Sequence, residues 1–223
     1  NEFLCMSVAK EAGIVVPEFY LSDNAKLFVM RRFDRDERLN PIGFEDMTAL
    51  MGLAAEQKYT KSYSAIAKAI RLFCAPDQIQ GSLAQLFAIV SLSCVVGNGD
   101  AHLKNFGLLY RSTSEVWLAP MFDVVTTSIY KYTQYPGGPE LEDRTLALKL
   151  FAGRHHTKAY PTTEELVDFG RRVCGVSQPG AVLVQIADAM SKTMGEAKGD
   201  SRIPPSLLAQ MAKVWDEGCA YAN

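Results

Sequence analysis

The sequence lacks any long uninterrupted hydrophobic run. Its most apolar stretch, residues 83–96, is broken by Gln85, Ser91 and Ser93, and it is shorter than the roughly 20 residues that a membrane-spanning helix needs. No leader with a basic start and an apolar centre opens the chain. These two absences lead us to expect a cytoplasmic protein that does not bind membranes.

Paired metal-ligand spacings and an excess of charge are absent too. The five cysteines are an odd number, and none stands in a Cys-x-x-Cys pair or in a cysteine–histidine pair. We therefore expect free thiols in a reducing compartment and no zinc site. The 23 basic and 25 acidic residues leave a net charge of −2, which gives no electrostatic reason for direct binding to nucleic acid.

The sequence does contain enough apolar residues for one good core, or for a large lobe with an appendage. Of the 223 residues, 48% are hydrophobic and 10% are aromatic, as is typical of globular chains. Apolar spacing and capping residues predict helices over residues 1–12, 44–53, 64–74, 76–96, 162–174, 179–197 and 205–221. Strands are predicted over residues 15–20, 26–32, 106–110, 115–119 and 146–150. The expected fold class is therefore α+β, mainly α.

The strongest functional signal follows the long apolar helix. Residues 97–99, Gly-Asn-Gly, are expected to end that helix, so that Asp100 lies on the loop beyond it. The next two predicted strands are joined by a polar turn and should pair as a hairpin in which residue numbers sum to about 226. That register brings Asn105 and Asp123 to the same end of the hairpin, close to Asp100.

This set of side chains suits phosphoryl transfer. A carboxylate orients and deprotonates the attacking hydroxyl, while an amide oxygen and a second carboxylate hold Mg²⁺ against the nucleotide phosphates. Asp100 and Asn105 have the separation found in kinase catalytic loops, and Asp123 takes the place of the later metal-binding carboxylate, although Val124 and not Phe follows it. The alternative is that Asp100 caps a helix or turn and Asn105 is an ordinary turn residue.

The chain closely resembles a known family of enzymes, the HipA bacterial serine/threonine kinases, which are the toxins of HipA/HipB toxin–antitoxin modules. The main resemblance lies in Gly-Asn-Gly-Asp-Ala-His-Leu-Lys-Asn-Phe at residues 97–106 and in Leu-Ala-Pro-Met-Phe-Asp-Val-Val at residues 118–125. Residues 1–6, 29–35 and 146–150 resemble the same family.

The resemblance implies a fold and a division of the chain. The fold would be a protein-kinase-like C-lobe of the HipA type, with a short β-hairpin remnant of the N-lobe and a β-hairpin at the catalytic loop. Residues 1–34 would be the end of the N-lobe, with a hinge at about residues 30–34. Residues 35–223 would be the helical C-lobe, with the catalytic loop at residues 97–124.

The resemblance also implies an activity and its central residues. The protein would transfer the γ-phosphoryl group of ATP to a serine or threonine hydroxyl of a protein. Asp100 would be the catalytic base, and Asn105 and Asp123 would bind Mg²⁺.

Four further residues are implied to contact the nucleotide. The backbone groups of Arg31 and Phe33 would meet the adenine at the hinge, and His102 and Lys104 would lie near the phosphates. Each has a plainer alternative. Arg31 and Phe33 would then belong to an ordinary surface strand, His102 would be a core or loop histidine with one backbone hydrogen bond, and Lys104 would be a solvated lysine.

Partners are implied as well. The best-known target of the family is an aminoacyl-tRNA synthetase, and a HipB-like antitoxin would connect the protein to DNA only indirectly. Residues 128–144 should form an irregular, mobile loop at the position of an activation segment. Its tyrosines, Tyr130, Tyr132 and Tyr135, would either contact a protein substrate or cover the lobe.

Two parts of a complete kinase do not occur in this sequence. It has no Gly-x-Gly-x-x-Gly loop for the phosphates, and its early lysines, Lys10 and Lys26, lie in a predicted helix and a hairpin strand. Because the first residue is Asn1, we expect a fragment that is inactive or weakly active alone. Two other classes stay open: a non-catalytic kinase-like module that binds an antitoxin, and a metal-dependent hydrolase that uses the same carboxylates.

Overall fold

The structure, a computed structural model, describes residues 1–153 and 155–222. Its α-helices are α1 (Glu2–Glu11), α2 (Met47–Leu50), α3 (Tyr63–Phe73), α4 (Ile79–Val95), α5 (Thr163–Asp168), α6 (Pro179–Ala197) and α7 (Pro205–Gly218). The strands are β1 (Phe19–Leu21), β2 (Phe28–Met30), β3 (Gly43–Asp46), β4 (Gly107–Ser112), β5 (Glu115–Leu118), β6 (Lys131–Tyr132) and β7 (Leu141–Glu142). Short 3-10 or π turns are η1 (Ala55–Tyr59), η2 (Leu103–Asn105), η3 (Thr127–Ile129), η4 (Phe169–Val173) and η5 (Cys219–Ala222). The expected fold class, α+β and mainly α, is confirmed.

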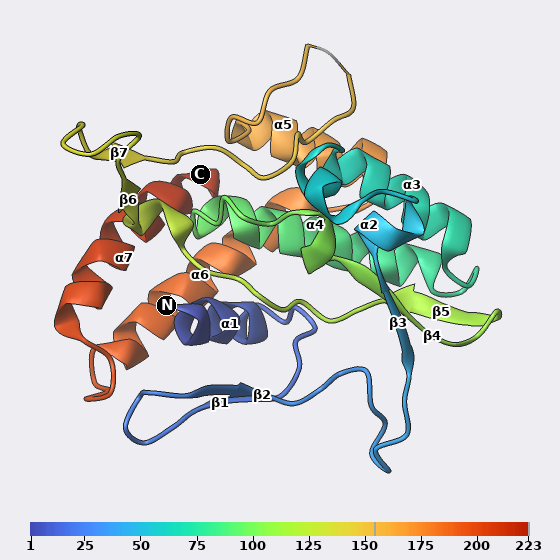
Figure 1. Ribbon diagram of the computed structural model, residues 1–223, viewed down its shortest axis with the longest axis horizontal. Coiled ribbons are helices and arrows are strands. Elements are labelled where there is room, and N and C mark those ends of the chain that lie inside the picture. Colours follow the sequence, from blue (N-terminus) through green and yellow to red (C-terminus); the bar gives the residue numbers. More distant parts are fainter. Residues whose placement is uncertain (154, 223) are drawn as a thin grey trace.

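Helix α4 forms the centre of the molecule (Figure 1). It packs against α3, α6, α7 and strand β5, and most of its side chains from Leu83 to Val95 are buried. Such burial is expected because the helix is apolar on every face. Gly218 of α7 lies so close to the carbonyl group of Val95 that any side chain there would collide with it. None of the helices in the described ranges combines the length and the hydropathy that crossing a bilayer requires.

Strands β4 and β5 form the hairpin expected from the predicted strands over residues 106–110 and 115–119. Leu108 pairs with Leu118 and Leu109 pairs with Trp117, so the register in which residue numbers sum to 226 is confirmed. The inward-facing residues of this hairpin pack on α4, which fixes the register because a one-residue slip would turn them outward.

Strand β3 corrects the helix predicted over residues 44–53. Phe44 pairs with Leu109 of β4, so β3 adds a third strand to the hairpin. The helix begins only after Asp46, whose side chain accepts hydrogen bonds from the N–H groups of Thr48 and Ala49 at 2.8 and 3.0 Å. Asp46 is thus an N-cap, and the residues before it are extended because the distant strand β4 offers them backbone partners.

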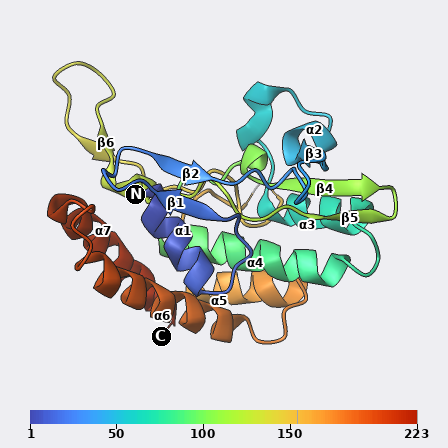
Figure 2. The same cartoon turned by 90° about the horizontal axis from the view of Figure 1, so that it is seen from below.

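Helix α1 and the hairpin β1–β2 lie at the edge of the helical body (Figure 2). Helix α1 packs against α6, and Phe3 of α1 contacts Phe19 of β1 with 5.9 Å between ring centroids. Cys5 and Met6 belong to the same hydrophobic core as the helices of the C-terminal half. The proposed boundary between two lobes at residue 34 stays a prediction.

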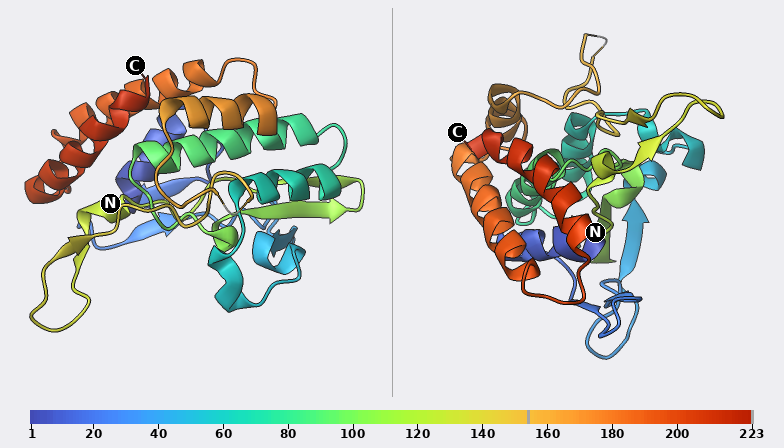
Figure 3. Two further views of the ribbon diagram at one scale, coloured as in Figure 1. Left: turned by 90° about the horizontal axis from the view of Figure 1, so that it is seen from above. Right: turned by 90° about the vertical axis from the view of Figure 1, so that its left-hand side faces the viewer.

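Two segments differ from the predicted elements. Within residues 128–144, Lys131 pairs with Glu142 in the short hairpin β6–β7, which projects from the body (Figure 3), so the expectation of a wholly irregular loop is wrong. Residues 146–150 are mostly buried but form no strand. Within this stretch only Lys149 forms a β-bridge, which pairs it with Ser62. The pairing ends there because α3 starts at Tyr63, the residue after Ser62.

Candidate functional site

Glycines allow the loop after α4 to approach other backbone segments closely. Gly97 has a φ of +70°, and its carbonyl oxygen accepts a hydrogen bond from the N–H of Thr127 at 3.0 Å. Gly99 donates its N–H to Thr127 Oγ1 at 2.7 Å, and a Cβ on Gly99 would lie 2.5 Å from the carbonyl oxygen of Thr145. The loop that carries Asp100 is therefore held between the two ends of the segment that contains β6 and β7.

Two of the three side chains expected at the mouth of the β4–β5 hairpin are in direct contact, and the third residue, Asp100, is linked to them through its backbone. Asn105 Nδ2 donates a hydrogen bond of 2.5 Å to Asp123 Oδ2. The backbone N–H of His102 is shared between the carbonyl oxygen of Asp100, at 2.8 Å, and Oδ1 of Asn105, at 3.0 Å. Asp100 and Asp123 are exposed, whereas Asn105 is buried. Two solvent-accessible carboxylates thus flank one buried amide.

Asp123 also connects this site with the predicted hinge. Its φ of +55° lies in the left-handed region, which residues other than glycine adopt at a cost of order 1 kcal/mol and which occurs often at functional sites. The neighbouring Phe122 contacts Phe33 with 5.1 Å between ring centroids, and Phe33 contacts Phe44 at 5.5 Å. This aromatic cluster fixes the hinge segment next to the carboxylate.

The oxygens of Asn105 and Asp123 fit a hard divalent cation such as Mg²⁺. Oδ1 of Asn105 uses one lone pair for the His102 N–H and keeps a second one. The pKa of Glu2 is raised by burial and by the negative charge of Asp123, so a cation here would relieve uncompensated charge. No group of three or more His, Cys, Asp or Glu in the described ranges could hold a metal alone. The donor set suits Mg²⁺ that takes its remaining ligands from water or phosphate.

His102 and Lys104 lie on the same loop but in different surroundings. The ring of His102 is buried, and its Nε2 lies 2.8 Å from Nζ of Lys58. Burial lowers the pKa of His102, the charge of Asp100 opposes this shift, and the charge of Lys58 adds to it. Lys104 is exposed to solvent. The implied roles of both residues near the phosphates stay predictions.

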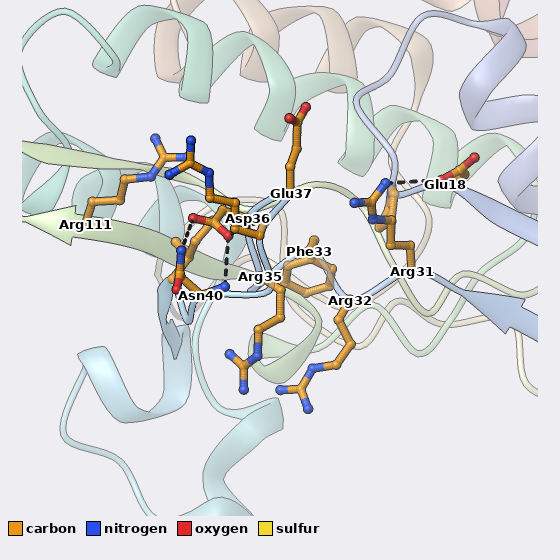
Figure 4. A pocket seen from close by; sticks show the side chains of 12 residues that line it. Glu18, Arg31, Arg32, Phe33, Arg35, Asp36, Glu37, Asn40 and Arg111 are labelled. Carbon is orange, nitrogen blue, oxygen red and sulfur yellow. Dashed lines mark hydrogen bonds and ion pairs between the residues drawn. The ribbon is translucent and has the colours of Figure 1, made fainter.

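The predicted hinge lines a cavity of about 580 Å³ (Figure 4). The backbone N–H of Arg31 donates to the carbonyl oxygen of Glu18 at 2.8 Å, and its guanidinium lies 3.6 Å from the carboxylate of Glu18. The carbonyl oxygen of Arg31 and the N–H of Phe33 form no hydrogen bond with any residue that the structure describes. These are the two backbone groups expected to meet adenine. The arginines that line the cavity are Arg31, Arg32, Arg35, Arg38 and Arg111.

Comparison with known proteins identifies the family of the chain. The family model of the HipA-like C-terminal domain matches residues 1–197. The chain belongs to the HipA-like C-terminal domain family. A relative of this HipA-like chain from Haemophilus influenzae, described as a candidate kinase, is 34% identical over 170 residues, which are 68% of this chain and 46% of the relative. A second candidate kinase, from Sinorhizobium fredii, is 28% identical over 145 residues, 58% of this chain and 34% of that protein.

Solved structures share the fold of this HipA-like domain. The HipA protein of Shewanella oneidensis, solved with HipB and operator DNA, superposes with a TM-score of 0.73 at 18% identity, covering 100% of this chain and 54% of that one. The proinflammatory kinase CtkA of Helicobacter pylori superposes with a TM-score of 0.65 at 15% identity, covering 99% and 82%. The chain spans about half or less of the curated relatives it matches.

Sequence reasoning missed three residues that the HipA-like fold brings to the site. Tyr59 of η1 donates its hydroxyl to Asp100 Oδ1 at 2.8 Å, and Lys58 contacts His102. Glu2 of α1 lies near Asp123. No spacing could have revealed them, since each is separated from its partner by more than 40 residues and depends on how α1 and η1 pack.

Proposed function

We propose that this HipA-like domain is the phosphoryl-transfer lobe of a protein serine/threonine kinase. The observation that carries the proposal is the contact between two oxygen-bearing side chains next to the loop that carries a third, that of Asp100. Asn105 and Asp123 are joined at 2.5 Å, and the shared N–H of His102 connects Asn105 to the backbone of Asp100. Both carboxylates are accessible to a substrate, as transfer to a protein hydroxyl requires.

Asp100 accepts the proton of the attacking hydroxyl. Its Oδ1 takes a hydrogen bond from Tyr59, which orients the carboxylate and leaves Oδ2 to meet the substrate. As the substrate oxygen bonds to the γ-phosphorus of ATP, the bond from that phosphorus to the bridging oxygen breaks and ADP leaves with the electron pair. Mg²⁺, when held by Asn105 and Asp123, would neutralise charge on the phosphates.

The nucleotide would reach this site from the hinge. Adenine would accept a hydrogen bond from the N–H of Phe33 and donate one to the carbonyl oxygen of Arg31. Both groups lack other hydrogen-bond partners in the described part of the chain. The cluster of Phe33, Phe44 and Phe122 supports the hinge from the side of the metal site.

The partners are proposed from the family. The Shewanella oneidensis HipA structure contains HipB and operator DNA. We infer a HipB-like antitoxin for the protein that carries this domain, with DNA bound through that antitoxin. The substrate is proposed to be a protein, and an aminoacyl-tRNA synthetase is the first one to test.

The test is transfer of labelled phosphate from ATP by the intact protein that contains this chain. Asp100→Asn should lower the rate by about 10²–10⁴, because it removes the base while keeping the shape of the side chain. Asp188→Asn is the matched control, since Asp188 is an exposed aspartate on α6 and should leave the rate unchanged. A rate for Asp100→Asn equal to that of the wild type would overturn the assignment.

A further inference from the structure

Lys58 is held against the catalytic loop by an uncharged partner. Its Nζ lies 2.8 Å from Nε2 of His102. An ammonium group has no lone pair and can only donate, so Nε2 must accept and the ring proton must sit on Nδ1. His102 is neutral in this arrangement and cannot itself supply positive charge to the site. Lys58 can, because its ammonium has two further N–H groups to donate.

Lys58 also lacks the usual compensation for a half-buried charge. Among the residues that the structure describes, it forms no ion pair with a carboxylate. The ammonium of Lys158 contacts the ring of Tyr59 as well, since Nζ of Lys58 and Nζ of Lys158 lie 4.9 and 5.4 Å from the ring centroid. Lys58 is thus a cation without a carboxylate partner, next to the tyrosine that contacts Asp100, and such a cation is suited to bind an anion.

Tyr59 connects Lys58 with the proposed base, Asp100. Its hydroxyl donates to Asp100 Oδ1 at 2.8 Å, and its ring packs edge-on against the ring of His102 with 5.2 Å between centroids. Because Lys58 and Tyr59 are consecutive residues of η1, one short turn fixes a cation and the base carboxylate relative to each other.

We propose that Lys58 is a catalytic residue that binds the phosphoryl group in transfer, and that Tyr59 is the positioning residue that fixes Asp100 beside it. The inference rests on the proposed kinase function and adds to it the source of the positive charge. Lys58 forms no covalent bond in the step. Its N–H groups bind oxygens of the γ-phosphoryl group while the bond to the substrate oxygen forms, the bond to ADP breaks and the hydroxyl proton passes to Asp100. Charge on those oxygens is stabilised most in the transition state.

The first test compares variants of the intact protein in steady-state transfer from ATP. Lys58→Met should lower kcat by about 10²–10³, the usual loss for one transition-state donor, with KM for ATP unchanged. Lys58→Arg should recover part of the loss because it keeps the charge. Tyr59→Phe should lower kcat by about tenfold, the loss of one hydrogen bond. Lys61→Met, at an exposed lysine beyond η1, is the matched control and should behave as wild type.

A second readout separates chemistry from structure. Lys58→Met should bind ADP as tightly as the wild type but should lose affinity for ADP with aluminium fluoride, which imitates the transferring phosphoryl group. A purely structural role would weaken both complexes and lower the melting temperature. Wild-type kcat in Lys58→Met, alongside an inactive Asp100→Asn, would overturn the role of Lys58 and leave the kinase function standing. If the wild-type protein transferred no phosphoryl group, both the role of Lys58 and the proposed kinase function would be overturned.

Discussion

Asn105 and Asp123 are joined by a hydrogen bond of 2.5 Å although 18 residues separate them in the chain. The hairpin β4–β5 lies between them and brings its two ends together. The contact is therefore a property of the hairpin register, which is fixed by packing on α4. The amide presents its N–H to Asp123 here, so a cation shared by the two residues would take the amide oxygen and the carboxylate as its ligands. The negative charge of Asp123 also raises the pKa of Glu2.

The charge of Asp123 should be measurable through Glu2. Asp123→Asn keeps the size of the side chain and removes the charge that, after burial, raises the pKa of Glu2. We expect the pKa of Glu2 to fall in this variant, as followed by NMR titration of its side-chain carboxyl. Asp188→Asn should leave it unchanged, and an unchanged value in Asp123→Asn would show that the two carboxylates do not interact.

Stability should decrease in mild acid because of His102. Burial lowers the pKa of this side chain in the folded state, so the unfolded chain, with a histidine pKa near 6.5, binds the proton more readily. The contribution of His102 is fully present above about pH 6.5 and is lost as the pH falls toward the lower folded value. Urea unfolding at pH 7.5 and pH 5.5 should show a smaller pH dependence in His102→Gln than in the wild type. An equal pH dependence of the free energy of unfolding in both proteins would contradict the lowered pKa of His102.

Two helical glycines should respond oppositely to the same substitution. Gly218→Ala places a methyl group against the carbonyl of Val95, where α7 meets α4, and should destabilise the fold by about 1–3 kcal/mol. Gly195 lies on the exposed face of α6, where an added Cβ would meet no other atom within 4 Å. Gly195→Ala should therefore stabilise the fold by about 0.4–1 kcal/mol. Chemical denaturation of both variants measures the difference. Similar effects in the two would mean that α7 does not approach α4 as described.

The hairpin and the contact between Asn105 and Asp123 could be predicted because the signals are local. A polar turn between two apolar strands sets the register, and the register alone places Asn105 and Asp123 at one end. The helix ending near Val96 is equally local, since residues 97–99 stop it. The helix predicted from residue 162 also begins at this point, because the side chain of Thr162 accepts a hydrogen bond from the N–H of Glu165.

What could not be predicted depends on distant partners. The residues around Phe44 are compatible with a helix. Phe44 belongs to a strand only because β4, more than 60 residues later in the chain, supplies its backbone partners. Residues 146–150 have a strand-like pattern and remain irregular because their backbone hydrogen bonds go to two separate segments. The N–H of Leu146 donates to the carbonyl oxygen of Lys158, whereas the carbonyl oxygen of Lys149 accepts from the N–H of Tyr63. Lys58 and Tyr59 gave no signal of their own, and their contacts arise from the packing of η1 on the loop.

The cysteines should differ sharply in reactivity. Burial raises the pKa of Cys5 to about 11 and that of Cys174 to about 12, so neither forms a thiolate at pH 8. Cys219 is only half-buried and should react first with a thiol reagent under native conditions. Mass spectrometry after brief labelling identifies the site. Equal labelling of Cys5 would show that the core around α1 is open.

The most direct test of the account is the position of a divalent cation. Crystals of the intact protein with ADP and Mn²⁺, a visible substitute for Mg²⁺, would locate the ion by its anomalous scattering. We predict a peak within about 2.0–2.3 Å of Oδ1 of Asn105 and of the Asp123 carboxylate, on the side that faces Asp100. Bound ADP with Mn²⁺ held by other residues, and with Asn105 and Asp123 making no contact to it, would contradict the account.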